Sequence, residues 1–224
     1  MKIIHPKTPG VPESVVSGYR ELLKIYSPSC VVADSLERQG VMHSAIKPAA
    51  PGRFVGPAVT VKLDPGDLVD CLEALKVAGP GDVIVVDACG ETETSVWGGL
   101  MAGLCKHKGV VGAVVDGAVR DIDEVKDLGF PLYSRAVVPR STHSPYSGRL
   151  DPIEVNGPVT CGGVIVNPGD VVLSDEIGVV VVPQDKAAEV LERAREQARK
   201  EEETRQRIRE GKSVDELLAE FGRL

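Results

Sequence analysis

The sequence predicts an α/β protein that ends in a long helical tail. Short apolar runs alternate with segments of helical periodicity between residues 55 and 137, and the next stretch contains short strands separated by glycine turns. From Asp185 to about Glu210 the chain is dense in Ala, Glu and Arg. With 224 residues and 42% hydrophobic content, it can bury one substantial core. We therefore expect one α/β domain at residues 1–183 and a helical extension at 184–224.

The N-terminal part is expected to form two helices, at 13–26 and 29–39, because apolar residues recur there at steps of three and four. These helices would cover a sheet as a cap. The elements expected after them are strand 55–63, helix 66–78, strand 81–88, helix 98–108, strand 110–115, helix 121–128 and strand 130–137. Glycines at the ends of the three helices provide their stop signals.

The last part of the domain is expected to be mostly β, with strands at 157–166, 170–175 and 178–183. The tail would form a helix from 185 to about 210 and a short helix at 213–221. The first tail helix is too long for one small domain to cover.

The composition limits the possible partners. A formal net charge of −7 and a pI near 5.2 disfavour nucleic-acid binding, which normally needs clustered Lys and Arg. The apolar runs are too short to cross a bilayer and the start resembles no signal peptide, so we expect a cytoplasmic protein without a membrane partner. The five cysteines are scattered and form no CxxC pair, which indicates buried thiols.

The most informative stretch is "GAVVDGAVRDIDEV" at 112–125, where Arg120 stands beside Asp121. In a strand-helix-strand unit with parallel strands, the helix begins at the sheet edge where the following strand ends. The residues expected to converge there are Gly98, Gly99, Leu100 and Met101 with Asp116, Gly117, Arg120 and Asp121. Free N–H groups and the helix dipole make a helix start an anion site, and glycines let a ligand approach the backbone. This edge is therefore expected to bind a carboxylate.

Two interpretations of Arg120 and Asp121 remain open at this point. In the functional one, the Arg120 fork binds the carboxylate and adjacent oxygen of a 2-oxo acid, and Asp121 is an oxygen ligand for Mg²⁺ or Mn²⁺. In the structural one, Asp121 caps the next helix with Glu124 as the reciprocal acid, and Arg120 simply pairs with Asp121.

The stretches "WGGLMAGLCKHKGVVGAVVDGAVRD", "GDVIVVD" and "PGDVVLSDEIGVVVVP" resemble the RraA-like family, and the resemblance runs from about residue 30 to 211. This family includes aldolases for 4-hydroxy-4-methyl-2-oxoglutarate and 4-carboxy-4-hydroxy-2-oxoadipate, which also decarboxylate oxaloacetate, and regulators of ribonuclease E. The resemblance implies a β/β/α sandwich of the swivelling-domain type. It also implies a homotrimer or homohexamer with sites between subunits. In such an assembly the C-terminal tail would pack against a neighbouring subunit.

By position, the resemblance implies that Arg120 contacts the pyruvyl part of the substrate, that Asp121 ligates the metal, and that the Leu100 and Met101 amides receive the carboxylate. Where the aldolases carry an aspartate, this sequence has Gly99. Glu91 or Glu93 in the preceding loop are the candidates to replace that acid.

The tail segment "KEEETRQRIREG" resembles the aldolases' C-terminal helix, whose glutamate reaches the metal site of the adjoining subunit; that position is Glu201. Independently, Glu201 continues the apolar stripe of Leu191, Ala194 and Ala198. The alternative is a solvated charge paired with Arg205.

We therefore expect a class II, divalent-metal-dependent lyase that cleaves a 4-hydroxy-2-oxo acid or decarboxylates oxaloacetate, giving pyruvate through an enolate. Its catalytic residues would be Arg120 and Asp121, its substrate-binding residues Gly98, Gly99, Leu100, Met101 and Arg120, and its metal ligands Asp121 and Glu201. The alternative is a non-catalytic regulator of a ribonuclease. The acid retained after Arg120 favours the enzyme. Of the remaining acids, Asp87 and Asp116 are expected to end strands, and Asp175 to shape a tight turn.

Overall fold

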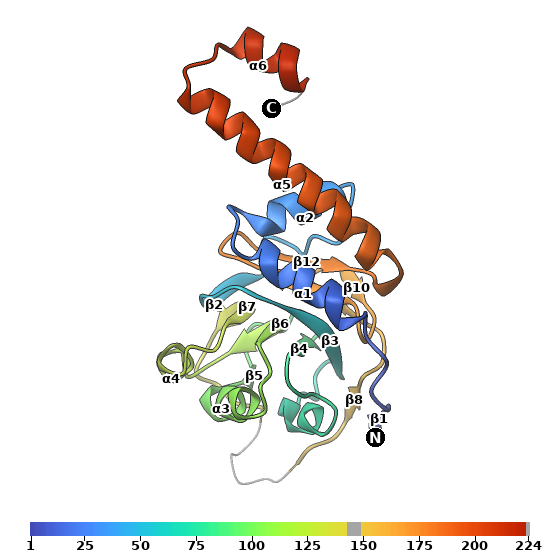
Figure 1. Cartoon of the computed structure of the whole chain (residues 1–224). Helices are drawn as coiled ribbons and strands as arrows, with labels where there is room; N and C mark the ends of the chain where they lie inside the picture. The colour runs from blue at the N-terminus through green and yellow to red at the C-terminus, as the bar shows by residue number, and fades with distance from the viewer. Residues whose placement is uncertain (143–148, 223–224) are drawn as a thin grey trace.

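The structure, a computed structural model, describes residues 1–142 and 149–222. Helices α1, α2 and α5 form one outer layer, the strands around β12 and β10 and the main sheet lie beneath it, and α3 and α4 lie beyond the main sheet (Figure 1). The expected α/β fold with a C-terminal helical tail is confirmed.

The main sheet runs in the order β1-β8-β3-β4-β6-β7-β2, and its four central strands β3, β4, β6 and β7 are parallel. Its strands are β1 (Lys2–Ile4), β2 (Lys47–Ala50), β3 (Phe54–Leu63), β4 (Val83–Asp87), β6 (Gly112–Val119), β7 (Leu132–Val137) and β8 (Ile153–Val155). Strands β4 and β6 are buried along their whole length. This burial explains the unbroken apolar run at the start of β4, because a central parallel strand is covered on both faces.

A second group of strands covers one face of the main sheet. It consists of β9 (Val159–Cys161), β10 (Val164–Val166), β11 (Val171–Ser174) and β12 (Val179–Val182). Strand β3 joins the two groups, since its first half pairs with β11 and its second half with β4. Between the groups, Val85, Val114 and Tyr133 share a buried core with Val172 and Val181.

Helices cover the two outer faces of the domain and form the tail. They are α1 (Glu13–Leu22), α2 (Pro28–Ser35), α3 (Gly99–His107), α4 (Ile122–Asp127), α5 (Ala187–Arg209) and α6 (Val214–Phe221), with short 3₁₀ segments η1 (Cys71–Lys76) and η2 (Gln184–Lys186). Met101, Ala102 and Cys105 of α3 pack on the main sheet, in the same core as Trp97 and Phe130. On the other side, α1, α2 and the first turns of α5 bury a separate apolar core against β11 and β12.

Several expected boundaries are wrong for local reasons. The helix expected at 66–78 is only the 3₁₀ segment η1, because Gly66 has a φ of +75° and Asp70 is extended. The strand expected at 157–166 is divided into β9 and β10 by Gly162 and Gly163, which both adopt positive φ in the turn. The strand expected at 110–115 continues to Val119, so Asp116 lies inside β6 and does not end a strand.

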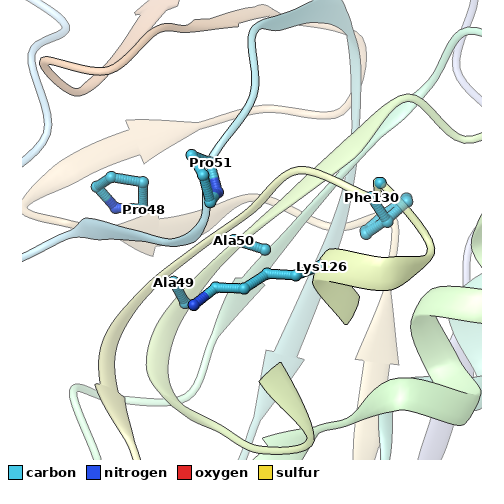
Figure 2. A pocket seen from close by; sticks show the side chains of 7 residues that line it. Pro48, Ala49, Ala50, Pro51, Lys126 and Phe130 are labelled. Atoms are coloured by element: carbon cyan, nitrogen blue, oxygen red, sulfur yellow. The ribbon is translucent and has the colours of Figure 1, made fainter. Parts of the chain in front are cut away.

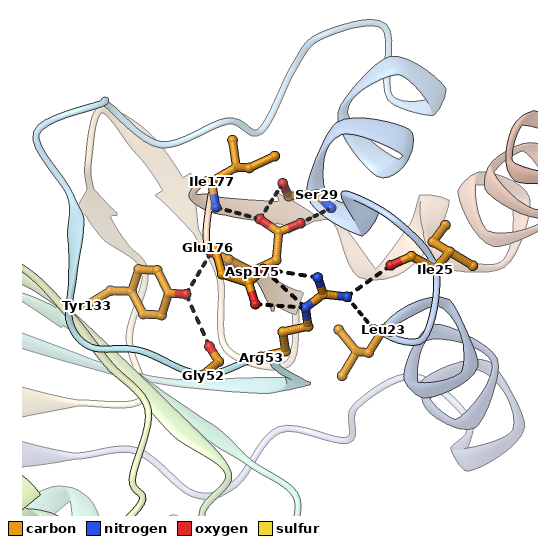
Figure 3. A network of polar contacts seen from close by, with 9 residues as sticks. All are labelled: Leu23, Ile25, Ser29, Gly52, Arg53, Tyr133, Asp175, Glu176 and Ile177. Carbon is orange, nitrogen blue, oxygen red and sulfur yellow. Dashed lines mark hydrogen bonds and ion pairs between the residues drawn. The ribbon is translucent and has the colours of Figure 1, made fainter. Parts of the chain in front are cut away.

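The β11–β12 turn is tied to the α1–α2 connection by a polar network (Figure 3). Asp175 accepts hydrogen bonds from the Ile177 N–H at 2.9 Å, the Ser29 N–H at 2.9 Å and the Ser29 hydroxyl at 2.7 Å. Beside it, the Arg53 guanidinium donates to the carbonyl oxygens of Leu23 at 2.8 Å and Ile25 at 2.9 Å. Asp175 therefore shapes its own turn, as expected, and also holds the start of α2.

The distal part of the tail projects away from the domain (Figure 1). The buried residues of α5 all lie in its first turns, from Ala187 to Ala194. Helix α6 begins with a capping box in which Ser213 and Glu216 bond each other's backbone N–H groups. Within residues 1–142 and 149–222, no helix is both long and apolar enough to pass through a bilayer.

Candidate active site

A short strand that sequence reasoning missed positions the start of α3. Strand β5 (Ser95–Trp97) pairs in parallel with the end of β6, Ser95 opposite Ala118 and Trp97 opposite Val119. Helix α3 starts directly after β5, with Gly98 as its N-terminal cap. Since the Arg120 N–H donates to the Trp97 carbonyl oxygen at 2.9 Å, the chain that leaves β6 stays beside the start of α3. The start of α3 and the end of β6 therefore converge as expected. The strand that leads directly into α3 is β5, whereas the sequence placed strand 81–88 before this helix.

The residues that converge line one small pocket with a volume of about 120 Å³. Five residues singled out in the sequence contribute to its wall: Gly98, Leu100, Met101, Arg120 and Asp121. The others are Asp70, Leu72, Ser95, Val96 and Trp97. Gly99 and Glu201 do not line this pocket, and Asp116 and Gly117 lie within β6.

The positive groups of the pocket suit a small anion. An α-helix leaves the N–H groups of its first turn without acceptors inside the helix. The Gly99 N–H donates to Asp121, and the Ala102 N–H to the Gly98 carbonyl oxygen. Among the described residues, the N–H groups of Leu100 and Met101 have no assigned acceptor outside the helix. Together with the Arg120 side chain, which is 36% exposed, they form the positive wall of the pocket.

The conformation of Asp121 argues against a simple capping role. Asp121 occupies the N-terminal cap position of α4, but its side chain makes no capping hydrogen bond to that helix. Instead, Oδ2 accepts from the Gly99 N–H of α3 at 3.2 Å and lies 3.5 Å from Arg120 Nε. The backbone is left-handed, with φ of 53° and ψ of 41°, a region that aspartate tolerates better than most residues. The capping interpretation of the sequence is wrong, whereas the contact between Arg120 and Asp121 is present.

Gly98 has a steric role in this arrangement. A Cβ atom at position 98 would lie 2.5 Å from Asp121 Oδ2 and 3.3 Å from Arg120 Cγ and Nε. The φ of Gly98 is −146°, which any residue can adopt, so the requirement for glycine is one of space. The missing side chain lets the Arg120–Asp121 pair lie against the start of α3.

Trp97 is a wall residue that sequence reasoning did not single out. Its side chain is 2% exposed and stacks on Phe130 with ring centroids 6.2 Å apart. Within the described part of the chain, the buried indole Nε1–H has no hydrogen-bond partner. A Trp directly before the glycine pair was the available signal, since an aromatic residue at a helix start can form part of a ligand wall.

Glu201 lies on α5 and bonds to side chains of its own helix. Its carboxylate accepts from Arg205 at 2.6 Å and from Gln197 at 3.1 Å. The Arg205 guanidinium in turn lies 5.4 Å from the centre of the Tyr26 ring. The pairing with Arg205 that the sequence left open is therefore present within one chain.

The loop acids Glu91 and Glu93 also lie outside the pocket wall, and Glu91 accepts a hydrogen bond from the Glu93 N–H at 2.6 Å. Within residues 1–142 and 149–222, no group of three or more His, Cys, Asp or Glu side chains is arranged to hold a metal. In one chain, Asp121 is therefore the only one of the two expected metal ligands that lies at the pocket.

Asp87 and Asp116 connect the main sheet to the second group of strands. Asp116 accepts from the Gly162 N–H at 2.6 Å and pairs with Arg135, which raises the pKa of that guanidinium. Asp87 accepts from the N–H groups of Cys89 at 2.9 Å and Thr160 at 3.3 Å. Both acids therefore connect the main sheet to the region of the β9–β10 hairpin.

A larger hollow lies on the other side of α4 (Figure 2). It has a volume of about 440 Å³, and its wall is formed by Pro48, Ala49, Ala50, Pro51, Lys126, Gly129 and Phe130. Lys126 is the one charged side chain in that wall. The smaller pocket is the better candidate for an active site, because it has more functional groups. The Arg120 guanidinium, the Asp70 and Asp121 carboxylates and the start of α3 all line it.

The structure is that of an α/β protein with a small pocket beside the start of α3, where Arg120 and Asp121 meet. Residues 29–181 match the RraA-like family, described as Aldolase/RraA. A relative from Halalkalibacterium halodurans, provisionally named a 4-hydroxy-4-methyl-2-oxoglutarate aldolase, is 36% identical over 181 residues, which are 80% of this chain and 83% of the relative. The 4-hydroxy-4-methyl-2-oxoglutarate aldolase of Thermus thermophilus is 33% identical over 132 residues, covering 59% and 77% of the two chains.

Solved structures agree with this assignment. An uncharacterized protein from Pseudomonas syringae pv. tomato has a TM-score of 0.78 at 29% identity, covering 94% of this chain and 99% of that one. Streptomyces coelicolor RraAS2, described as an unusual member of the RNase ES inhibitor RraA protein family, has a TM-score of 0.74 at 31% identity, covering 88% and 99%. The chain belongs to the RraA-like family.

Proposed function

We propose that this protein is a divalent-cation-dependent carbon–carbon lyase that releases pyruvate. Its substrate would be a 4-hydroxy-2-oxo acid of the 4-hydroxy-4-methyl-2-oxoglutarate type, or oxaloacetate. The observation that carries the proposal is the meeting of Arg120, Asp121 and the start of α3 in one pocket. The activity named for the Thermus thermophilus relative supports the same reaction class.

The positive wall would bind the pyruvyl part of the substrate. Its carboxylate would accept hydrogen bonds from the Leu100 and Met101 amides, which lie at the positive end of the α3 dipole. The Arg120 guanidinium would donate to the carboxylate and the neighbouring 2-oxo oxygen, a pairing that suits its planar fork. When the carbon–carbon bond breaks, negative charge grows on that oxygen, and a fixed guanidinium stabilises it without reorganisation.

Asp121 is suited to hold the cation. Its side chain is 42% exposed at the pocket, and its contacts to Gly99 N–H and Arg120 both involve Oδ2. Oxygen atoms of this kind are the ligands that Mg²⁺ and Mn²⁺ prefer. The cation would act as a Lewis acid towards the 2-oxo oxygen. Glu201 of a neighbouring copy would complete the site in a homotrimer or homohexamer.

Pyruvate release tests the proposal. Oxaloacetate and 4-hydroxy-4-methyl-2-oxoglutarate are supplied with Mg²⁺ or Mn²⁺, with and without chelator, to the parent and to Asp121→Asn. We expect activity that needs the cation and is lost in the variant. Asp123→Asn is the matched control, because it removes the same charge from an exposed residue two positions away. Absence of activity on both substrates, or activity untouched by chelation and by Asp121→Asn, would contradict the proposal.

A second candidate is regulation of a ribonuclease, favoured by the similarity to Streptomyces coelicolor RraAS2. The net charge of −7 suits a basic partner surface. A regulator that acts by binding a ribonuclease would not need the Asp121 carboxylate at the pocket. Inhibition of a purified ribonuclease of the E or ES type, together with no lyase activity on either substrate, would favour the regulator.

A further inference from the structure

The pocket beside the start of α3 has one cationic side chain in its wall. That side chain is Arg120, and the acids Asp70 and Asp121 lie in the same wall. In the proposed function, Arg120 and the first amides of α3 bind the pyruvyl carboxylate of the substrate. Among the described residues that line the pocket, no Lys, His or second Arg remains for another anionic group. The far end of a bound substrate would therefore meet no positive side chain of this wall.

Asp70 adds negative charge to the wall. It lies directly before η1, which packs beside α3, and its carboxylate accepts a hydrogen bond from the Thr142 hydroxyl at 3.3 Å. Within the described part of the chain no ion pair neutralises Asp70, whereas Asp121 is paired with Arg120. Two further wall residues, Leu72 and Leu100, are exposed apolar side chains. This set suits an uncharged alkyl or hydroxyl group and opposes a carboxylate.

The indole N–H of Trp97 independently marks the pocket as a ligand site. Trp97 is a buried wall residue, and its Nε1–H has no partner among the described residues. Native structures seldom leave a buried donor unpaired without a functional reason. Because this donor is uncharged, it favours a carboxylate less strongly than a guanidinium does. It therefore does not replace the missing second cation.

We propose that the pocket selects 4-hydroxy-2-oxo acids whose end remote from the 2-oxo group is uncharged, and that Asp70 disfavours those that end in a second carboxylate. The inference rests on the proposed function. Dicarboxylates would still bind through their pyruvyl end, but they would be cleaved less efficiently because their second carboxylate meets the like charge of Asp70. The proposed cation would not offset this repulsion, since it is assigned to Asp121 and the 2-oxo oxygen.

The selection acts on the fragment that leaves. In the cleavage the C3–C4 bond breaks, the 4-hydroxyl group loses its proton, and C4 becomes the carbonyl carbon of an aldehyde or ketone. The electron pair of the broken bond forms the pyruvate enolate, which then takes up a proton at C3. All substrates of this class share the pyruvyl half, so a difference in rate between them reports on the groups that contact the leaving half.

A matched pair of substrates tests the selection. In 4-hydroxy-2-oxopentanoate a methyl group occupies the place of the second carboxylate of 4-hydroxy-2-oxoglutarate, and both compounds release pyruvate in one assay. We expect the parent to show kcat/KM at least about fivefold higher for the pentanoate, which is the effect of one exposed contact between like charges. This preference should shrink at about 0.5 M salt, because ions screen exposed charges.

Variants at position 70 assign the preference to one carboxylate. Asp70→Asn should lower the ratio of the two kcat/KM values at least about threefold, and Asp70→Lys should reverse the preference by offering a cation. Asp64→Asn is the matched control, because it removes the same charge from an exposed residue that follows β3 and lies outside the pocket wall. Its ratio should stay within about twofold of the parent. Thermal unfolding of each variant verifies that the fold is intact.

The outcomes separate this inference from the proposed function. Equal or better cleavage of the glutarate by the parent would overturn the selection and leave the proposed function intact. A ratio that Asp70→Asn and Asp70→Lys both leave unchanged would do the same. Absence of pyruvate release from these two compounds, from oxaloacetate and from 4-hydroxy-4-methyl-2-oxoglutarate would overturn both.

Discussion

Replacing Gly98 with alanine should damage the site without damaging the fold. The new methyl group would lie 2.5 Å from Asp121 Oδ2, so the carboxylate must retreat by about 1 Å to reach ordinary van der Waals contact. The Arg120 side chain, 3.3 Å from the same point, would also be crowded. Because Gly98 has an extended backbone, alanine adds no strain there. A misplacement of about 1 Å in a reacting geometry can lower the rate about 100-fold, which is the loss in kcat/KM we expect.

The assay is pyruvate release with Mg²⁺, together with thermal unfolding. Gly103→Ala is the matched control, since it lies in the same helix and its methyl group would meet only Leu128 Cδ1 at 3.8 Å. That variant should keep its activity and gain up to about 1 kcal/mol of stability from better helix propensity. Parental kcat/KM in folded Gly98→Ala would refute the steric account of the pocket.

Three further outcomes are expected. Arg120→Lys should lower kcat/KM about 10–100-fold, because a point charge replaces the bidentate fork; kinetics equal to the parent would remove Arg120 from the site. Asp175→Ala should lower the free energy of unfolding in urea by about 3 kcal/mol, since it leaves buried donors at Ser29 unpaired; a change below about 1 kcal/mol would contradict the role of this network. Burial raises the pKa of the Cys71, Cys105 and Cys161 thiols, that of Cys105 to about 12, so these three should resist a disulfide reagent at pH 8 until the chain unfolds. Rapid modification of these thiols in the native protein would contradict their complete burial.

The site could be predicted largely from chain topology. A parallel strand-helix-strand unit forces the helix start and the end of the next strand to one sheet edge, so Gly98, Leu100, Met101, Arg120 and Asp121 could be placed together without coordinates. The fold class followed in the same way from the alternation of apolar strands and helices. Both rest on periodicities that extend over many residues.

The remaining features depend on contacts that no local pattern encodes. Strand β5 has three residues, too few to show alternation. The left-handed backbone of Asp121 and the contact between Glu124 and Gly99 arise from the packing of α4 against α3. The bond between Asp175 and Ser29 joins residues 146 positions apart. The sequence pattern also permits Asp121 and Glu124 to form a helix cap, which was one of the two interpretations left open. Tertiary packing instead turns both side chains towards the start of α3.

The most direct test of the central claim is a crystal structure of the protein with oxalate and Mn²⁺. Oxalate resembles the planar pyruvate enolate that carbon–carbon cleavage would form before a proton converts it to pyruvate. We expect it in the pocket beside Trp97, with one end at the Leu100 and Met101 amides and Arg120, and with Mn²⁺ on Asp121. An oxalate and Mn²⁺ pair bound elsewhere, or a pocket that excludes both while Arg120 and Asp121 keep their positions, would contradict the claim.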